Sequence, residues 1–159
     1  MANEEAFMGA RTALILFDTY VNTVAQEIGR ERAVALMTEI CESIGAMRGK
    51  MLKEQSDIEE FDAKTAWSLV KALKDTLEEN HEVLEESPQR VLVRNGRCPF
   101  YEAARWLGME PNTIETNCRA GPMKLMDTVV KQLNPNLNVQ IRKPRSTLDD
   151  FCKEEIVLV

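Results

Sequence analysis

The stretch HEVLEESPQRVLVR, residues 81–94, decides the fold, because the chain before it has the periodicity of helices and this stretch does not. Its two short runs, HEVLEE and RVLVR, flank a Ser-Pro-Gln turn, a pattern that predicts a β-hairpin. Near the end of the chain, LNVQIR alternates apolar and polar residues and CKEEIVLV follows it. These two segments predict two further strands, joined by the polar segment 143–150.

The first 80 residues predict helices. Apolar residues at spacings of three and four indicate one helix that ends near Gly29, and a second helix with a methionine-rich face follows it. A third helix is expected to begin after Asp62, a good N-cap residue. The proposed inward face of the first helix is Ala13, Phe17, Tyr20, Val24 and Ile28, and that of the second is Ala33, Met37, Ile40, Ile44, Met47 and Met51.

Two more helices are expected between the hairpin and the last two strands. One runs from Pro99 to about Leu107 and ends at Gly108, and the other covers about 119–133, with a regular start delayed to Pro122. The prediction is a single α+β domain over residues 1–159, in which N-terminal helices pack on a four-stranded, mainly antiparallel sheet in a β-β-α-α-β-β order. Residues 1–80 form its helical half, and residues 81–159 form a mixed half that carries the cysteines.

Composition excludes some classes of function. The net charge of −6 and the absence of a basic cluster argue against a nucleic-acid partner. The apolar run 14–17 is too short for a signal core or a membrane span, so no membrane partner is expected and a cytoplasmic location is the prediction. Four cysteines are too few for a disulfide scaffold, which leaves packed thiols, metal ligands or nucleophiles.

Cys98 is the thiol most suited to chemistry. It precedes Pro99, a favoured first helical residue, and is therefore expected to be an N-cap that faces unpaired N–H groups and the positive end of the helix dipole. Both features favour thiolate, and Arg97 adds a cation. The alternative is a neutral thiol that only begins a helix. Cys118 is expected in a similar environment near the start of the next helix, whereas Cys41 is expected to be a packed thiol.

A metal site is a second possibility for the thiols. Cys98, Cys118 and Cys152 could hold zinc or iron together with a carboxylate or water, since zinc favours four soft or borderline donors. The spacing does not contain the paired Cys-x-x-Cys knuckles of zinc ribbons. His81 could add a ligand or a base, or be an ordinary strand residue.

The segments RCPFYEAARWLGMEPNTIETNC, residues 97–118, and LNPNLNVQIRKPRSTLDDFC, residues 133–152, resemble the L-2-amino-thiazoline-4-carboxylic acid hydrolase-like family. That family is similar to vinyl-reductase-type ligand-binding domains. The resemblance implies a ligand cavity between helices and sheet, with cysteines near it. Leu148 replaces a usual glycine, and Ile141 and Pro144 occupy places where related domains have zinc ligands. The positions that match are Cys98, Pro99, Tyr101, Cys118, Pro135, Asp149 and Cys152.

The resemblance implies a hydrolase that opens a cyclic C–N bond, as in an aminothiazoline carboxylate. Cys98 would be the nucleophile or a metal ligand, Asp149 or Glu115 would handle the proton, and Tyr101 would orient the substrate. Arg119 or Arg97 would bind a substrate carboxylate.

The alternative is a sensor domain that binds a small molecule or a metal without turnover. The sequence has no well-placed histidine base, and Phe100, Trp106, Met123 and Met126 could line a pocket or simply form the core. A structural subunit that forms a homodimer through its long helices is a third hypothesis. It explains the methionines but not the cysteines.

Overall fold

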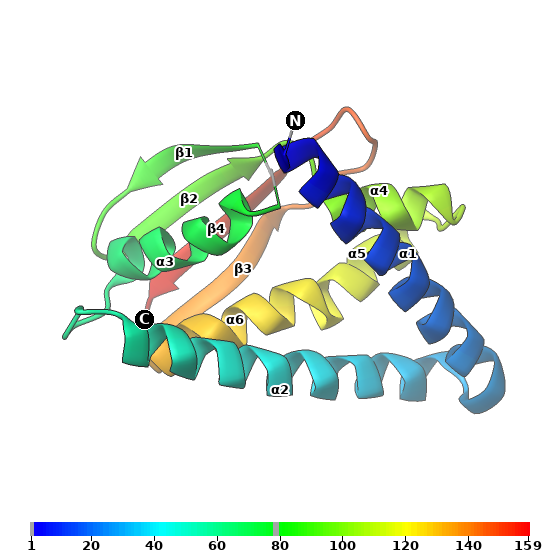
Figure 1. Ribbon diagram of the computed structural model, residues 1–159, viewed down its shortest axis with the longest axis horizontal. Helices are drawn as coiled ribbons and strands as arrows, with labels where there is room; N and C mark the ends of the chain where they lie inside the picture. The colour runs from blue at the N-terminus through cyan, green and yellow to red at the C-terminus, as the bar shows by residue number, and fades with distance from the viewer. Residues whose placement is uncertain (1, 78–79) are drawn as a thin grey trace.

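The computed structural model describes residues 2–77 and 80–159 and has an α+β fold, as predicted (Figure 1). Among the described residues, no helix is long and apolar enough to span a bilayer. In chain order the elements are α1 Ala2–Ile28, α2 Arg30–Gln55, α3 Ala63–Asp75, β1 His81–Glu86, β2 Arg90–Asn95, α4 Pro99–Trp106, α5 Pro111–Ala120, α6 Pro122–Leu133, β3 Leu137–Lys143 and β4 Cys152–Leu158.

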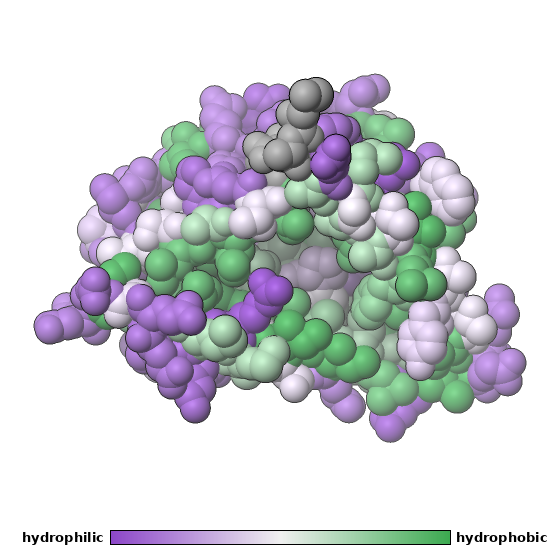
Figure 2. Space-filling view, viewed as in Figure 1, coloured by the Kyte–Doolittle hydropathy of each residue, from purple (hydrophilic) through white to green (hydrophobic). Residues whose placement is uncertain are grey.

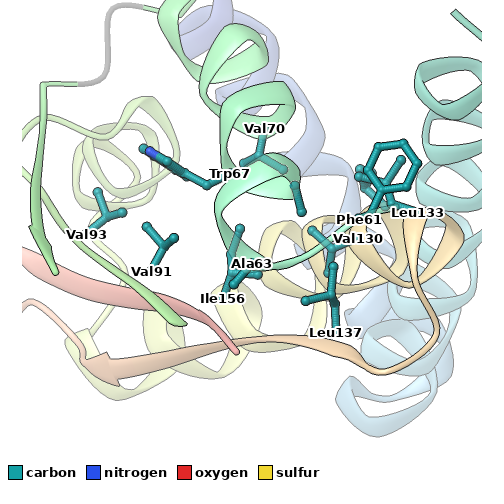
Figure 3. Packing of buried hydrophobic residues seen from close by; sticks show 12 residues of the cluster. Phe61, Ala63, Trp67, Val70, Val91, Val93, Val130, Leu133, Leu137 and Ile156 are labelled. Carbon is teal, nitrogen blue, oxygen red and sulfur yellow. The ribbon is translucent and has the colours of Figure 1, made fainter. Parts of the chain in front are cut away.

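The four strands form one antiparallel sheet in the order β1-β2-β4-β3, so the predicted hairpin and both C-terminal strands are confirmed. Helices α3 and α6 cover one face of it and supply most of the main core (Figure 3). Trp67 and Val70 of α3 pack there with valines of β2, Ile156 of β4 and Leu137 of β3. In β1, the residues after His81 are exposed, and β1 is an edge of the sheet.

Local signals predicted the helix ends well. Helix α1 ends at Ile28 before Gly29, which has a φ of 88°, and Gly108 follows α4 with a φ of 73°. Both values lie in the left-handed region that glycine adopts without steric strain. At the start of α3, the Asp62 carboxylate accepts a hydrogen bond from the Thr65 N–H, and the Thr65 hydroxyl accepts one from the Asp62 N–H.

One helix is additional to the prediction. Pro111 begins α5, and Gly121 separates it from α6, so three helices rather than two connect β2 to β3. Cys118 consequently lies in the last turn of α5, not near a helix start. The expected similarity between Cys98 and Cys118 was therefore wrong, because the two thiols lie at opposite ends of their helices.

The predicted inward faces of α1 and α2 were also partly wrong. Tyr20 is 65% exposed and Met47 is 58% exposed. On α1, the buried side chains include Phe7, Asp18 and Val21. On α2, the buried residues are Ala33, Met37, Cys41, Gly45 and Gly49, one every four residues.

The two glycines let α2 lie close to α6. A Cβ atom at Gly45 would lie 2.6 Å from the Leu125 carbonyl oxygen, and one at Gly49 would lie 2.6 Å from the Val129 carbonyl oxygen. Real Cβ atoms do not approach backbone this closely. The absence of a side chain thus sets the distance between the helices.

Replacing Gly49 with alanine is expected to lower the free energy of unfolding by about 1–3 kcal/mol, because overpacking forces the helices apart. Alanine in a helix interior brings a separate gain of up to about 1 kcal/mol, and we expect the cost of overpacking to outweigh this gain. Gly9→Ala in α1 is the matched control, since nothing lies within 4 Å of its added Cβ, and it should stabilise the protein. Urea unfolding of both variants tests the contrast, and equal stabilisation by both substitutions would contradict it.

Candidate functional site

A cavity of about 510 Å³ lies where the helices meet the ends of β2, β3 and β4. Figure 2 shows it as a hollow between α1, α2 and α3, with hydrophobic residues around much of its rim. Its volume is in the range of sites for small molecules, and such sites are commonly apolar with a few polar groups. The apolar lining includes Leu14, Phe17, Phe100, Ile114, Met123 and Met126.

All four cysteines line this cavity as free thiols. Burial raises the pKa of Cys118 well above its usual value, and the nearby charges of Cys98, Glu154 and Cys152 raise it further. Burial also raises the pKa of Cys41. Cys118 and Cys41 are therefore neutral thiols at pH 7, and Cys98, Cys118 and Cys152 lie close enough to interact electrostatically.

Cys98 is the N-cap residue of α4, as the Cys-Pro pair predicted. Its side chain makes no capping hydrogen bond. The first intrahelical bond at this end is donated by the Glu102 N–H to the Cys98 carbonyl, so the N–H groups of Phe100 and Tyr101 have no acceptor within the helix. A helix start thus lies directly beside a thiol that faces the cavity.

The donors near the cysteines do not fit a metal site. Among residues 2–77 and 80–159, no three His, Cys, Asp or Glu side chains are arranged to hold a metal ion. A metal bound by Cys118 would have to displace its proton, which burial holds more tightly than usual because it raises the pKa of this thiol. Zinc or iron bound by Cys98, Cys118 and Cys152 therefore stays a prediction without a fitting set of ligands.

The end of the cavity beside the sheet is polar, and Arg145 is its centre. Arg145 is 6% exposed, and its Nε donates a hydrogen bond to the Cys152 Sγ at 3.3 Å. Its Nη2 donates to the carbonyl oxygens of Asn95 and Gly96. Burial alone would lower the pKa of Arg145, but the hydrogen bond to Cys152 and the charges of Cys152, Cys98 and Tyr101 outweigh burial and raise it.

Two further polar side chains at this end lack partners. Asn95 is 2% exposed and Tyr101 is 4% exposed. Neither the amide atoms of Asn95 nor the Tyr101 hydroxyl makes a hydrogen bond with a described residue. Asn95 pairs with Cys152 in the sheet register, and the Arg145 Cζ lies 5.3 Å from the centre of the Tyr101 ring. The sequence interpretation overlooked Asn95 and Arg145.

The other predicted site residues divide into two groups. Tyr101, Phe100 and Met123 are buried and line the cavity. Asp149 and Arg119 do not line it and are exposed, which does not fit their expected roles as proton carrier and substrate cation. Arg119 forms an ion pair with Glu115 one helical turn away.

The carboxylate next to Asp149, that of Asp150, has a structural role. The Asp150 carboxylate accepts hydrogen bonds from Lys143 and from the Ser146 backbone N–H, and this fixes the loop between β3 and β4. These bonds hold the pKa of Asp150 well below its usual range. Asp150 is therefore a structural carboxylate, and Asp149 beside it is exposed and does not line the cavity.

The remaining candidates lie elsewhere. His81 contacts Asp75, with 3.1 Å between Nε2 and the carboxylate, and its ring meets the edge of Trp67. It does not line the cavity, and neither does Trp106, which is 66% exposed.

Charged groups on the cavity wall are mostly paired. Lys74 and Glu154 form an ion pair of 2.9 Å, and Glu115 is paired with Arg119.

Asp18 is a buried acid on α1 that the sequence interpretation missed. It is 0% exposed, and neither carboxylate oxygen has a hydrogen-bond partner among the described residues. Burial raises its pKa to about 6. An unpaired buried carboxylate is unfavourable, so the fold favours the protonated form.

The fold and the cavity define an α+β protein with a thiol-lined, largely apolar pocket. The chain belongs to the L-2-amino-thiazoline-4-carboxylic acid hydrolase family, whose model matches residues 9–152. No curated protein matches it. One similar solved structure is a trafficking protein particle complex subunit 3 from Naegleria fowleri covalently bound to palmitic acid. The match covers 96% of each chain, with 18% identity and a TM-score of 0.56, and so shows a shared fold.

Proposed function

We propose that this protein is a small-molecule hydrolase that uses Cys98 as a nucleophile on a substrate held in the cavity. The family is named after a hydrolase of a small molecule. The observation that carries the proposal is the position of Cys98, which caps α4 and lines the cavity close to Arg145. A cysteine at a helix start is a typical arrangement for an activated thiol.

The reaction would proceed in two steps. The Cys98 sulfur attacks the acyl or amidine carbon, and the oxyanion or nitrogen anion that develops accepts hydrogen bonds from the N–H groups of Phe100 and Tyr101. The C–N bond then breaks, the thiol proton goes to the leaving nitrogen, and a thioester or its imine analogue remains on Cys98. Water cleaves the C–S bond of that intermediate, which releases the product and restores the thiol.

Tyr101 would position the substrate rather than transfer a proton. Burial raises the pKa of Tyr101, so its hydroxyl keeps its proton at neutral pH and can donate a hydrogen bond to the substrate. The family name suggests an aminothiazoline carboxylate as the substrate. The cavity is larger and more apolar than such a compact polar ring requires, which favours a substrate with an apolar body.

The second candidate function is binding without turnover. The described cavity lining contains no histidine, and its carboxylates, Glu115 and Glu154, are both paired with cations. The solved structure of similar fold holds palmitic acid covalently, which is compatible with a covalently held apolar molecule in this architecture. The two functions differ in whether a covalent intermediate is hydrolysed.

Mass spectrometry after rapid mixing tests the proposal. The protein is mixed with N-decanoyl-p-nitroanilide, and release of p-nitroaniline is followed while the intact mass is recorded. The proposal expects transient acylation of the peptide that contains Cys98, followed by return to the original mass. Stable acylation would favour binding without turnover, whereas acylation of Cys152 instead of Cys98 would overturn the assignment of the nucleophile.

A further inference from the structure

The charge of Arg145 is buried without a carboxylate to balance it. Within the described part of the chain, its hydrogen bonds go to two neutral carbonyl oxygens and to the Cys152 sulfur, and it forms no ion pair. Burying a cation is unfavourable unless an anion compensates it. Its Nη1 group makes no hydrogen bond with a described residue, which leaves donors for a ligand.

Asn95 and Tyr101 extend the same polar end. Their buried polar atoms have no partner among the described residues, although buried polar groups are nearly always hydrogen-bonded in folded proteins. Both residues line the cavity next to Arg145, which donates a hydrogen bond to the Asn95 backbone carbonyl and lies over the Tyr101 ring. Together the three side chains offer a cation, a hydroxyl donor and an amide donor at the same end of the cavity.

The rest of the cavity has a different character. Leu14, Phe17, Ile114, Met123 and Met126 line it, and aliphatic or aromatic groups of this kind offer no hydrogen bonds to a ligand. This lining suits a ligand that is anionic at one end and largely apolar along its length.

We infer that the cavity binds a carboxylic acid with an apolar chain, whose carboxylate is held by Arg145, Tyr101 and Asn95. This inference rests on the proposed function and names the product class of the same site. Hydrolysis of an acyl thioester adds water to the acyl carbon, breaks the C–S bond and returns a proton to Cys98. The new carboxylate, which loses its proton at neutral pH, forms beside Arg145, whose Nη1 group can donate a charge-assisted hydrogen bond to it.

Isothermal titration calorimetry on the Cys98→Ser variant tests the inference without turnover. The probes are decanoate and decan-1-ol, which share the apolar chain and differ in the polar end. Decanoate is expected to bind at least tenfold more tightly than decan-1-ol at pH 7.5. Equal affinities, or no binding of either probe, would overturn the inference.

Three substitutions in the same background locate the carboxylate. Arg145→Met should remove the preference for decanoate, and Tyr101→Phe, which loses no hydrogen bond to a described residue, should weaken decanoate binding about three- to tenfold. Arg94→Met is the matched control, because Arg94 is exposed, pairs with Glu82 and does not line the cavity. Circular dichroism checks that each variant folds, and if Arg145→Met does not fold, Tyr101→Phe decides.

The assignment would be overturned if Arg145→Met still prefers decanoate to decan-1-ol. It would also be overturned if Tyr101→Phe binds decanoate as tightly as the background variant. These titrations measure binding alone, because the background variant lacks the Cys98 thiol, so their result can be separated from that of the hydrolase proposal. Carboxylate binding without any acylation of Cys98 in the wild-type protein would contradict the hydrolase and leave the carboxylate site intact.

Discussion

Cys98→Ala is expected to lower the turnover number by about 10³-fold or more while the protein stays folded and still binds its ligand. The substitution removes the sulfur that forms the covalent intermediate and leaves the cavity lining otherwise unchanged. Alanine at the N-cap gives up no side-chain capping bond, because Cys98 makes none, so little stability should be lost. Steady-state kinetics on an acyl nitroanilide and thermal unfolding measure the two effects separately.

Cys118→Ala is the matched control for this experiment. Cys118 lines the same cavity, but burial keeps its thiol neutral, and it lies at the carboxyl end of α5. Its removal should change turnover by less than about tenfold, which corresponds to 1.4 kcal/mol in the barrier. If Cys98→Ala keeps most of the activity, or if both variants lose it equally, Cys98 is not the nucleophile.

Asp18→Asn is expected to raise the stability of the protein at neutral pH. The pKa of Asp18 is about 6 in the folded state, above the ordinary value of 3.8 that applies when the chain is unfolded. Between these values the folded state binds the proton more tightly, so the free energy of unfolding decreases as the pH rises. The decrease amounts to roughly 3 kcal/mol by pH 7 and is absent below pH 3.8, where both states are protonated.

Asparagine has a similar shape and no charge, so the variant should lose this pH dependence and exceed the wild type by up to roughly 3 kcal/mol above pH 6. Urea unfolding at pH 4.5, 6 and 7.5 measures the difference. Asp57→Asn is the control, since Asp57 is exposed, and its curve should follow that of the wild type. The key quantity is the difference in free energy of unfolding between the wild type and Asp18→Asn. If this difference is the same at pH 4.5 and at pH 7.5, Asp18 is not a buried, unpaired carboxylate.

Local chemistry made most of the fold predictable. Gly29, Asp62 and Gly108 end or begin helices because their own conformations and side chains suit those positions. In the strands, apolar and polar residues alternate because successive side chains point to opposite faces of the sheet. The buried faces of α1 and α2 were harder to predict from the sequence. Glycine is not counted among the apolar residues that mark a buried helix face. Gly45 and Gly49 are nevertheless buried, because α6 packs directly against their backbone.

The candidate site was predictable only in part, for a related reason. Cys98, Phe100, Tyr101 and Met123 could be found because a helix start and an apolar helix face are visible in sequence, and all four reach the cavity. Arg145 lies in a polar segment that resembles a solvent-exposed loop, and its burial depends on carbonyl groups about fifty residues earlier. Asn95 becomes recognisable only through its pairing with Cys152 across the sheet.

Strand β1 carries Glu82, Glu85 and Glu86 on an open border of the sheet. Unpaired N–H and C=O groups at such a border can recruit a strand from another molecule, which is how many sheet proteins begin to aggregate. Glu82, Glu85 and Glu86 form ion pairs with Arg94, Arg90 and Lys64, so a strand added along this border would have to displace or desolvate these charges.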